Sequence, residues 1–222
     1  MERILLSERY LVLLLHAAGE QADLGQPQYS AGVILGGILD LREAGCIKIR
    51  PDGRLAVSAP LPLECSGLQE TYKRIGSSSK TAAFWLEYFC CSPDSKRLRL
   101  ILEEMYAALE KKGIMEVRTA KGLWGRKTKV RLCRSESEKI AGDFLKRTKT
   151  PQLEEHTVFC IQMLKLAGVL KKYFSWREGQ RLKAVLRQCG ETQMWREMSP
   201  YVNWIRNFMY QNAVNSGAVY QA

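Results

Sequence analysis

An unbroken apolar stretch near the start of the chain constrains the fold most. Residues Tyr10–Leu15 read YLVLLL, and Ser7 precedes them as a candidate helix cap. A helix from Ser7 to about Ala18 is apolar on nearly every side, which is typical of a helix that is buried all round. The run is far shorter than the ~20 residues that cross a bilayer. The sequence therefore predicts a helical body packed around this segment.

A helix, a glycine and a β-hairpin follow one another in that order twice. The two copies span residues 31–57 and 93–132, and their helices end at Gly45 and Gly113, where a glycine can take the left-handed conformation. Short alternating runs separated by turn residues predict a hairpin after each glycine. The four strands are predicted at Cys46–Ile49, Arg54–Val57, Ile114–Val117 and Lys129–Leu132. This order is also the pattern of a winged helix.

Helical segments fill most of the remaining chain. They are predicted at Ser66–Ile75, Ala82–Phe89, Ser135–Thr148, Thr150–Leu170, Trp176–Gln188 and Pro200–Asn212. A length of 222 residues fits one domain at roughly 100–200 residues per domain. We therefore predict a single mainly α domain over residues 1–222 with two small β-hairpins, the second of them basic and projecting, and a frayed tail over residues 215–222.

Residues that could support catalysis or metal binding are sparse. The chain has seven cysteines but no CxxC pair, and its histidines are His16 and His156, each on a helix where a structural role is the usual one. Glu103 and Glu104 are neighbours on a helix and point to different sides. The sequence predicts no enzyme activity, no cofactor and no metal site. Most of its cysteines are expected to be small core residues in a reducing compartment.

The amino-terminal residues do not resemble a signal peptide. Glu2 and Glu8 interrupt the basic region that such a peptide needs, and the apolar stretch is short. No run is long enough for a transmembrane helix. We therefore expect a cytoplasmic protein that associates with a membrane only peripherally.

The positive charge is concentrated in one part of the chain. The net charge is +11, and residues 111–149 hold 13 Lys and Arg against four Asp and Glu. Such a segment attracts nucleic acid, anionic lipid or an acidic protein, or forms a solvated face.

The second hairpin of residues 118–129 carries most of this charge. It reads RTAKGLWGRKTK, and its predicted tip pairs Leu123 with Trp124. An exposed indole is stable at a bilayer interface, and each cation near an anionic surface gains roughly 1 kcal/mol. A buried Trp124 is the structural alternative, and stacking on a nucleic-acid base is a third use. The candidate membrane contacts are Lys121, Leu123, Trp124, Arg126 and Lys127.

Two arginines follow the predicted start of the preceding helix. Arg97 and Arg99 lie near a helix amino terminus, which offers free N–H groups and the positive end of the helix dipole to a phosphate. An ion pair between Arg99 and Glu103, four residues on, is the structural alternative.

The order and spacing of several segments are similar to those of the Golgi phosphoprotein 3-like family, including its bacterial members. The matching segments span nearly the whole chain and are Leu11–Leu15, Ala31–Leu35, Glu43–Ile47, Gly53–Val57, Leu109–Ile114 and Leu164–Leu170.

The resemblance implies a helical domain whose hairpin faces a bilayer. In the eukaryotic members of the family it also implies a peripheral membrane protein that binds phosphatidylinositol 4-phosphate in a shallow basic pocket and binds the cytoplasmic tails of membrane glycosyltransferases. Arg99 matches one basic residue of that pocket, while Leu102 stands where the family has a second. Arg97 lies close enough to compensate, and Tyr29 stands in for the pocket's aromatic residue.

The sequence favours a peripheral membrane protein that binds anionic phospholipid head groups. The alternative is a nucleic-acid-binding protein with tandem winged-helix-like units, although the helix of residues 31–43 carries only Arg42 as a positive charge. A scaffold for an acidic protein tail is a third hypothesis. The sequence leaves open the lipid head group, the protein cargo and self-association.

Overall fold

The structure is a computed structural model that describes residues 3–91, 95–122, 125–150, 152–188 and 193–215. These residues form a mainly α protein with two separate two-stranded antiparallel sheets, as predicted. The helices are α1 (Leu6–Ala18), α2 (Pro27–Glu43), α3 (Gln69–Ser77), α4 (Ala82–Cys90), α5 (Ser95–Lys111), α6 (Arg134–Arg147), α7 (Glu155–Leu166), α8 (Trp176–Gln188) and α9 (Gln193–Asn215), with 3-10 turns η1 (Leu63–Leu68) and η2 (Leu170–Lys172). The strands are β1 (Ile47–Ile49), β2 (Leu55–Val57), β3 (Met115–Gly122) and β4 (Gly125–Leu132).

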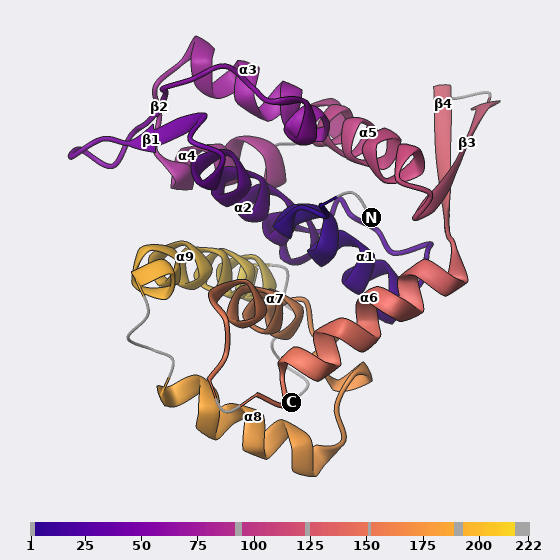
Figure 1. The fold of residues 1–222 in the computed structure, drawn as a ribbon. Helices are drawn as coiled ribbons and strands as arrows, with labels where there is room; N and C mark the ends of the chain where they lie inside the picture. The colour runs from indigo at the N-terminus through magenta and orange to yellow at the C-terminus, as the bar shows by residue number, and fades with distance from the viewer. Residues whose placement is uncertain (1–2, 92–94, 123–124, 151, 189–192, 216–222) are drawn as a thin grey trace.

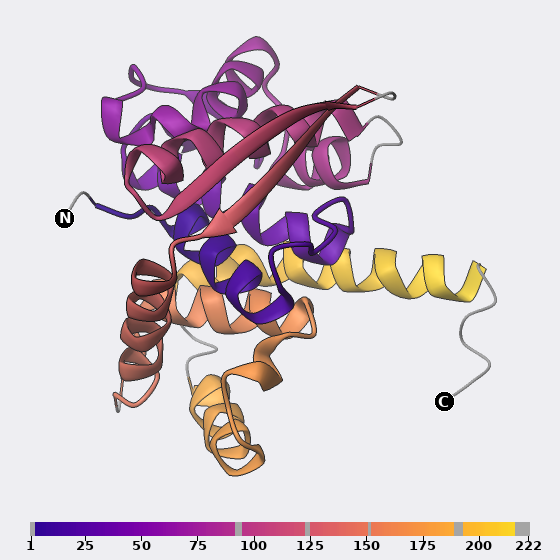
Figure 2. The ribbon, with the colours of Figure 1, turned by 90° about the vertical axis from the view of Figure 1, so that its right-hand side faces the viewer.

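Helices α1 and α2 pack against each other in the middle of the helical body (Figure 1). Helices α3 and α5 lie on one side of this pair, and α7 and α9 lie on the other. The β3–β4 hairpin and α6 lie along one edge, while α8 lies at the end of the molecule away from α3 and α5. The hairpin and α8 are therefore well separated, as the view in Figure 2 also shows.

The prediction of a helix buried on all sides is confirmed for α1. The side chains of Tyr10–Leu14 have no exposed area, and Leu15 is 1% exposed. This burial comes from contacts with α2, α6 and α7, which surround α1. The apolar stretch is thus the centre of the core, in line with its composition.

The prediction that Ser7 caps α1 is wrong. The helix begins at Leu6, and the Ser7 hydroxyl donates to the Asp40 carboxylate of α2 at 2.6 Å. The backbone N–H groups of Leu6 and Ser7 donate to the same carboxylate at 2.8 and 2.9 Å, so Asp40 supplies the cap from a neighbouring helix. Burial raises the pKa of Asp40, and the hydrogen bonds from Ser7 and Leu6 oppose that shift.

Two glycines allow α2 to approach α1 closely. A Cβ atom on Gly36 would lie 2.9 Å from the Ser7 Cα, and one on Gly32 would lie 2.3 Å from the Tyr10 ring. Because the two glycines are four residues apart, they lie on the same face of α2. This close contact places Asp40, one turn beyond Gly36, at the first turn of α1.

The helix predicted over Thr150–Leu170 is shorter at both ends. The Thr150 hydroxyl donates to the carbonyl of Arg147, so Thr150 closes α6 instead of opening α7. At the other end α7 stops at Leu166, and Gly168 turns the chain with a φ of 73°. The helix predicted from Pro200 begins earlier, at Gln193, so Pro200 lies inside α9.

A buried ion pair attaches the carboxyl end of α5 to α1. The Lys112 ammonium lies 2.6 Å from the Glu8 carboxylate, which is 1% exposed, and also donates to the carbonyl of Arg3. The Glu8 carboxylate in turn accepts from the N–H of Leu5. This pair fixes the position from which the β3–β4 hairpin leaves the core.

Candidate membrane-binding surface

The base of the β3–β4 hairpin is anchored on the core. Met115 and Val130 are buried, and the N–H of Val117 donates to the Glu110 carboxylate of α5 at 2.9 Å. The N–H of Leu132 donates to the Glu20 carboxylate at 2.7 Å. Edge N–H groups that would otherwise face solvent thus have acceptors from two other segments, which orients the hairpin.

One face of the hairpin presents unburied cations. Arg118 pairs with Lys129 and Glu116 pairs with Arg131 in the strand register, and all four residues are exposed. Because side chains alternate between the two faces of a strand, these four lie on the face opposite Val130. Glu116 is the one acidic residue in the two strand sequences, and its ion pair with Arg118 at 3.6 Å is exposed to solvent. Such a pair contributes little to stability, so the face keeps a net positive charge.

The far end of the hairpin continues the basic character in sequence. The strand register pairs Lys121 with Arg126 and Ala120 with Lys127. Figure 2 shows the hairpin crossing the face of α5 toward the amino-terminal end of that helix. Leu123 and Trp124 lie outside the described residues, so the membrane contact predicted for them stays a prediction, as it does for Lys121, Arg126 and Lys127.

Arg97 and Arg99 engage different partners. The Arg97 guanidinium lies 4.1 Å from the centre of the Tyr88 ring of α4, whereas Arg99 forms an ion pair with Glu103 at 3.6 Å. Residues two apart on a helix point to different sides, so these contacts do not bring the two guanidinium groups together. The ion pair predicted as the structural alternative for Arg99 is therefore present.

Tyr29 lies in the first turn of α2, half-buried against the hydrophobic core. Its carbonyl accepts a hydrogen bond of 3.1 Å from the hydroxyl of the buried Tyr10. The residue therefore has a structural contact through its backbone. Its predicted role beside a head group stays a prediction from the family resemblance.

A cation–aromatic cluster on α4 escaped the sequence analysis. Phe84 and Tyr88 stack with ring centres 5.9 Å apart, and the Lys80 ammonium lies 5.4 Å from the centre of the Phe84 ring. Arg74 donates to the Tyr88 hydroxyl at 3.4 Å. Cations on ring faces combine charge with apolar area, as residues at membrane interfaces do. The spacing of four residues between Phe84 and Tyr88, on one face of a predicted helix, is the signal that could have revealed this cluster.

The two histidines join segments that are distant in the sequence. His16 Nδ1 lies 3.2 Å from the Tyr173 hydroxyl, and His156 Nε2 lies 2.6 Å from the Glu43 carboxylate. Among the described residues, no group of three or more His, Cys, Asp or Glu side chains is arranged to hold a metal ion.

The cysteines within the described part of the chain are all free thiols. Burial raises the pKa of Cys90 and of Cys160 to about 12, which keeps both protonated and weakly nucleophilic at neutral pH. Cys46 and Cys65 are buried as well. These four confirm the expectation of small core residues.

The fold and this surface define a mainly α protein that presents a basic β-hairpin at the edge of its helical body. The family model described as Golgi phosphoprotein 3 (GPP34) matches residues 6–204, and the chain belongs to this family. The resemblance seen in the sequence is thereby confirmed. No match is found among curated proteins. Over the described residues, none of the helices is both long and apolar enough to cross a bilayer.

Proposed function

We propose that this protein is a peripheral membrane protein, without catalytic activity, that binds anionic phospholipid head groups on the cytoplasmic face of a membrane. The observation that carries the proposal is the outer hairpin face, where Arg118, Lys129 and Arg131 are exposed beside a single acid. Membership of the Golgi phosphoprotein 3 family supports the same function. Recognition of the cytoplasmic tails of membrane proteins, which the family resemblance also implies, is part of the proposal.

The energy of such binding comes from clustered charge and an apolar tip. Each cation close to an anionic bilayer contributes about 1 kcal/mol, so three exposed cations contribute about 3 kcal/mol. Trp124 and Leu123 add apolar burial at the interface. The electrostatic part falls with salt, because the Debye length is about 8 Å at physiological ionic strength.

Selectivity for phosphatidylinositol 4-phosphate is the finer proposal, and it rests on Tyr29, Arg97 and Arg99 through the family resemblance. The contacts of Arg97 with Tyr88 and of Arg99 with Glu103 favour a general anionic surface over one closed pocket. We therefore expect binding to follow the charge of the vesicle more than the identity of its head group.

Nucleic-acid binding is less well supported. In a tandem winged-helix protein, α2 would occupy the position of the first recognition helix. All residues of α2 from Ser30 to Leu41 are buried, so this helix has no polar face to offer to base edges. A recognition helix must expose such a face to enter a groove.

Vesicle flotation tests the proposal. We expect binding to vesicles that contain phosphatidylserine or phosphatidylinositol 4-phosphate at matched charge, and none to neutral phosphatidylcholine vesicles. The double change Leu123→Ser and Trp124→Ser should abolish flotation and leave the melting temperature nearly unchanged, because a membrane-facing tip contributes little to the core. A large loss of stability would instead place the tip in the core.

The chain offers a matched control for that double change. Leu63 is 92% exposed and Tyr210 is 65% exposed, and both lie outside the hairpin. The combined changes Leu63→Ser and Tyr210→Ser remove one aliphatic and one aromatic side chain and should leave flotation intact. Equal binding to neutral and anionic vesicles, or binding to neither, would overturn the proposal.

A further inference from the structure

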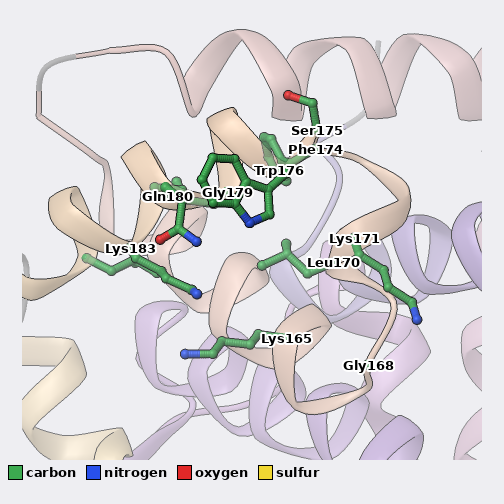
Figure 3. Close-up of a pocket in the computed structure, with 12 residues that line it drawn as sticks. Lys165, Gly168, Leu170, Lys171, Phe174, Ser175, Trp176, Gly179, Gln180 and Lys183 are labelled. Atoms are coloured by element: carbon green, nitrogen blue, oxygen red, sulfur yellow. The ribbon is translucent and has the colours of Figure 1, made fainter.

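A pocket of about 500 Å³ lies where the end of α7, the turn η2 and helix α8 meet (Figure 3). Its wall is largely apolar and includes Leu170, Phe174, Leu182 and Leu186. Leu182 is buried, and the other three are half-buried. A concave, mainly apolar site of this volume is typical of small-molecule binding sites.

Trp176, the first residue of α8, lines this pocket although 77% of its surface is exposed. In Figure 3 its indole lies above Leu170, between the two ends of the pocket. An indole in this position has apolar area to bury against a ligand without rearrangement of the core.

The polar groups of the pocket lie mainly at one end. In Figure 3 the ammonium groups of Lys165 and Lys183 approach each other from opposite sides, below the Gln180 amide, and the ammonium group of Lys171 lies well away from them. No acidic residue lines the pocket, and neither Lys165 nor Lys183 has an ion pair within the described ranges. Two lysines without an acidic partner beside an apolar wall are complementary to an anion that carries an apolar chain.

The nearest acid on α8, Glu178, is engaged elsewhere. Its carboxylate accepts hydrogen bonds from the N–H and hydroxyl of Ser175 at 2.9 and 2.7 Å. These bonds lower the pKa of Glu178, so it stays charged, and it lines a separate, smaller cavity. It therefore does not neutralise the lysine end.

We propose that this pocket binds a fatty acid. The carboxylate lies between Lys165 and Lys183, and the hydrocarbon chain packs against Leu170 and Phe174 beneath the Trp176 indole. A partner helix would need an extended groove with anchors every three or four residues, whereas this apolar wall is confined to one pocket. Helix α8 and the β3–β4 hairpin are well separated (Figures 1 and 2), so the pocket shares no residue with the hairpin face. The site is thus independent of the proposed membrane binding.

Calorimetric titration with laurate, kept below its micelle-forming concentration, tests this inference. Laurate should bind, acetate should not, and dodecyl maltoside, with the same chain length and a neutral head, should bind at least 10-fold more weakly. The double change Lys165→Gln and Lys183→Gln should weaken laurate binding at least 10-fold. The matched double change Lys48→Gln and Lys111→Gln, at exposed lysines outside the pocket, should not.

A change at the indole separates binding from folding. Trp176→Ser should weaken laurate binding at least 10-fold without lowering the melting temperature, since the side chain is mostly exposed. Equal affinity for laurate and dodecyl maltoside would overturn the fatty-acid assignment, as would laurate affinity that none of the pocket variants changes. A concentration-dependent dimer that Trp176→Ser abolishes would show that a second copy of the chain occupies the pocket, and would also overturn it.

Discussion

The protein has two helix–hairpin units, α2 with β1 and β2, and α5 with β3 and β4. Their helices end alike, but their hairpins differ. Gly45 and Gly113 end α2 and α5 with φ angles of 72° and 69°. In both units the N–H of the residue after the glycine donates to the carbonyl five residues before it, at 2.9 and 3.0 Å. This is the same helix-ending motif, and it aims the chain into a strand in both places.

Strand length and what covers the strands separate the units. Strands β1 and β2 have three residues each, and the N–H of Leu55 in β2 donates to the carbonyl of Lys80 in the segment before α4. Strands β3 and β4 have eight residues each and carry the exposed face of Arg118, Lys129 and Arg131. The comparison teaches that the same helix-ending motif starts both hairpins, whereas strand length and the segments that cover the strands decide how far each hairpin extends beyond the core.

Both units are also attached to the first turn of α1 through a charged residue. Asp40, near the end of α2, accepts from Leu6 and Ser7, and Lys112, after α5, pairs with Glu8. The first unit therefore uses an acid that accepts from backbone N–H groups, and the second uses a buried ion pair. These attachments hold both units on the central helix α1.

The largest expected effect comes from breaking the second attachment. Lys112→Met leaves the Glu8 carboxylate buried with the Leu5 N–H as its remaining donor in the described contacts. Removing one partner of a buried pair typically costs about 3–5 kcal/mol. Chemical denaturation should show that loss in the free energy of unfolding.

The neighbouring residue provides the control for that change. Lys111 is exposed, so Lys111→Met should alter stability by about 0.5 kcal/mol or less. The double variant Glu8→Gln and Lys112→Met should recover part of the loss, because no charge is then left without a partner. A loss at Lys112 no greater than that at Lys111 would mean that the pair does not hold the second unit.

A smaller effect is expected from removing positive charge from one hairpin at a time. Arg118→Gln, Lys129→Gln and Arg131→Gln together remove three exposed cations from the second hairpin. Affinity for anionic vesicles should fall roughly 100-fold, from about 1 kcal/mol per cation. Co-sedimentation at fixed salt measures this change.

The first hairpin carries a matched set. Lys48, Arg50 and Arg54 are exposed, and the set likewise has a single acidic partner, Asp52, 3.5 Å from Arg54. Their combined change to Gln lowers the net charge equally and should leave affinity almost unchanged. Equal losses from the two triple variants would show that vesicles respond to net charge alone and not to the hairpin face.

Much of this architecture could be predicted because it depends on local signals. The buried helix was predicted from the apolar run Tyr10–Leu15, and the left-handed helix ends were predicted from Gly45 and Gly113. The structure confirms these predictions. The cap of α1 was missed because the acceptor of its first N–H groups is Asp40, which lies 34 positions after Leu6 in the sequence. A local rule assigned that role to Ser7, whose hydroxyl is a donor to the same carboxylate.

Some features of the candidate membrane-binding surface could likewise be predicted from the sequence, and others could not. The basic run of residues 118–129 placed cations on the hairpin from the sequence alone. The strands were predicted too short, because β3 continues to Gly122 and β4 begins at Gly125. The partners of Arg97 and Arg99 depend on which side of α5 faces α4, and only the packing reveals that. The pocket beside Trp176 is formed by the end of α7, the turn η2 and helix α8. The relative positions of these segments cannot be predicted from sequence periodicity.

The smallest effect is expected from Gly45→Ala and Gly113→Ala, which test whether the two helix ends are equivalent. A Cβ atom added at Gly45 or at Gly113 would have no atom within 4 Å, so Gly45→Ala and Gly113→Ala meet no steric obstacle. Each residue must still hold a left-handed conformation, which costs an alanine about 1 kcal/mol. Thermal and chemical denaturation should therefore give similar losses for the two variants. A clearly larger loss at Gly113 would show that the long hairpin depends on its helix end more than the short one does, because eight-residue strands that leave the core have fewer other contacts to fix their direction.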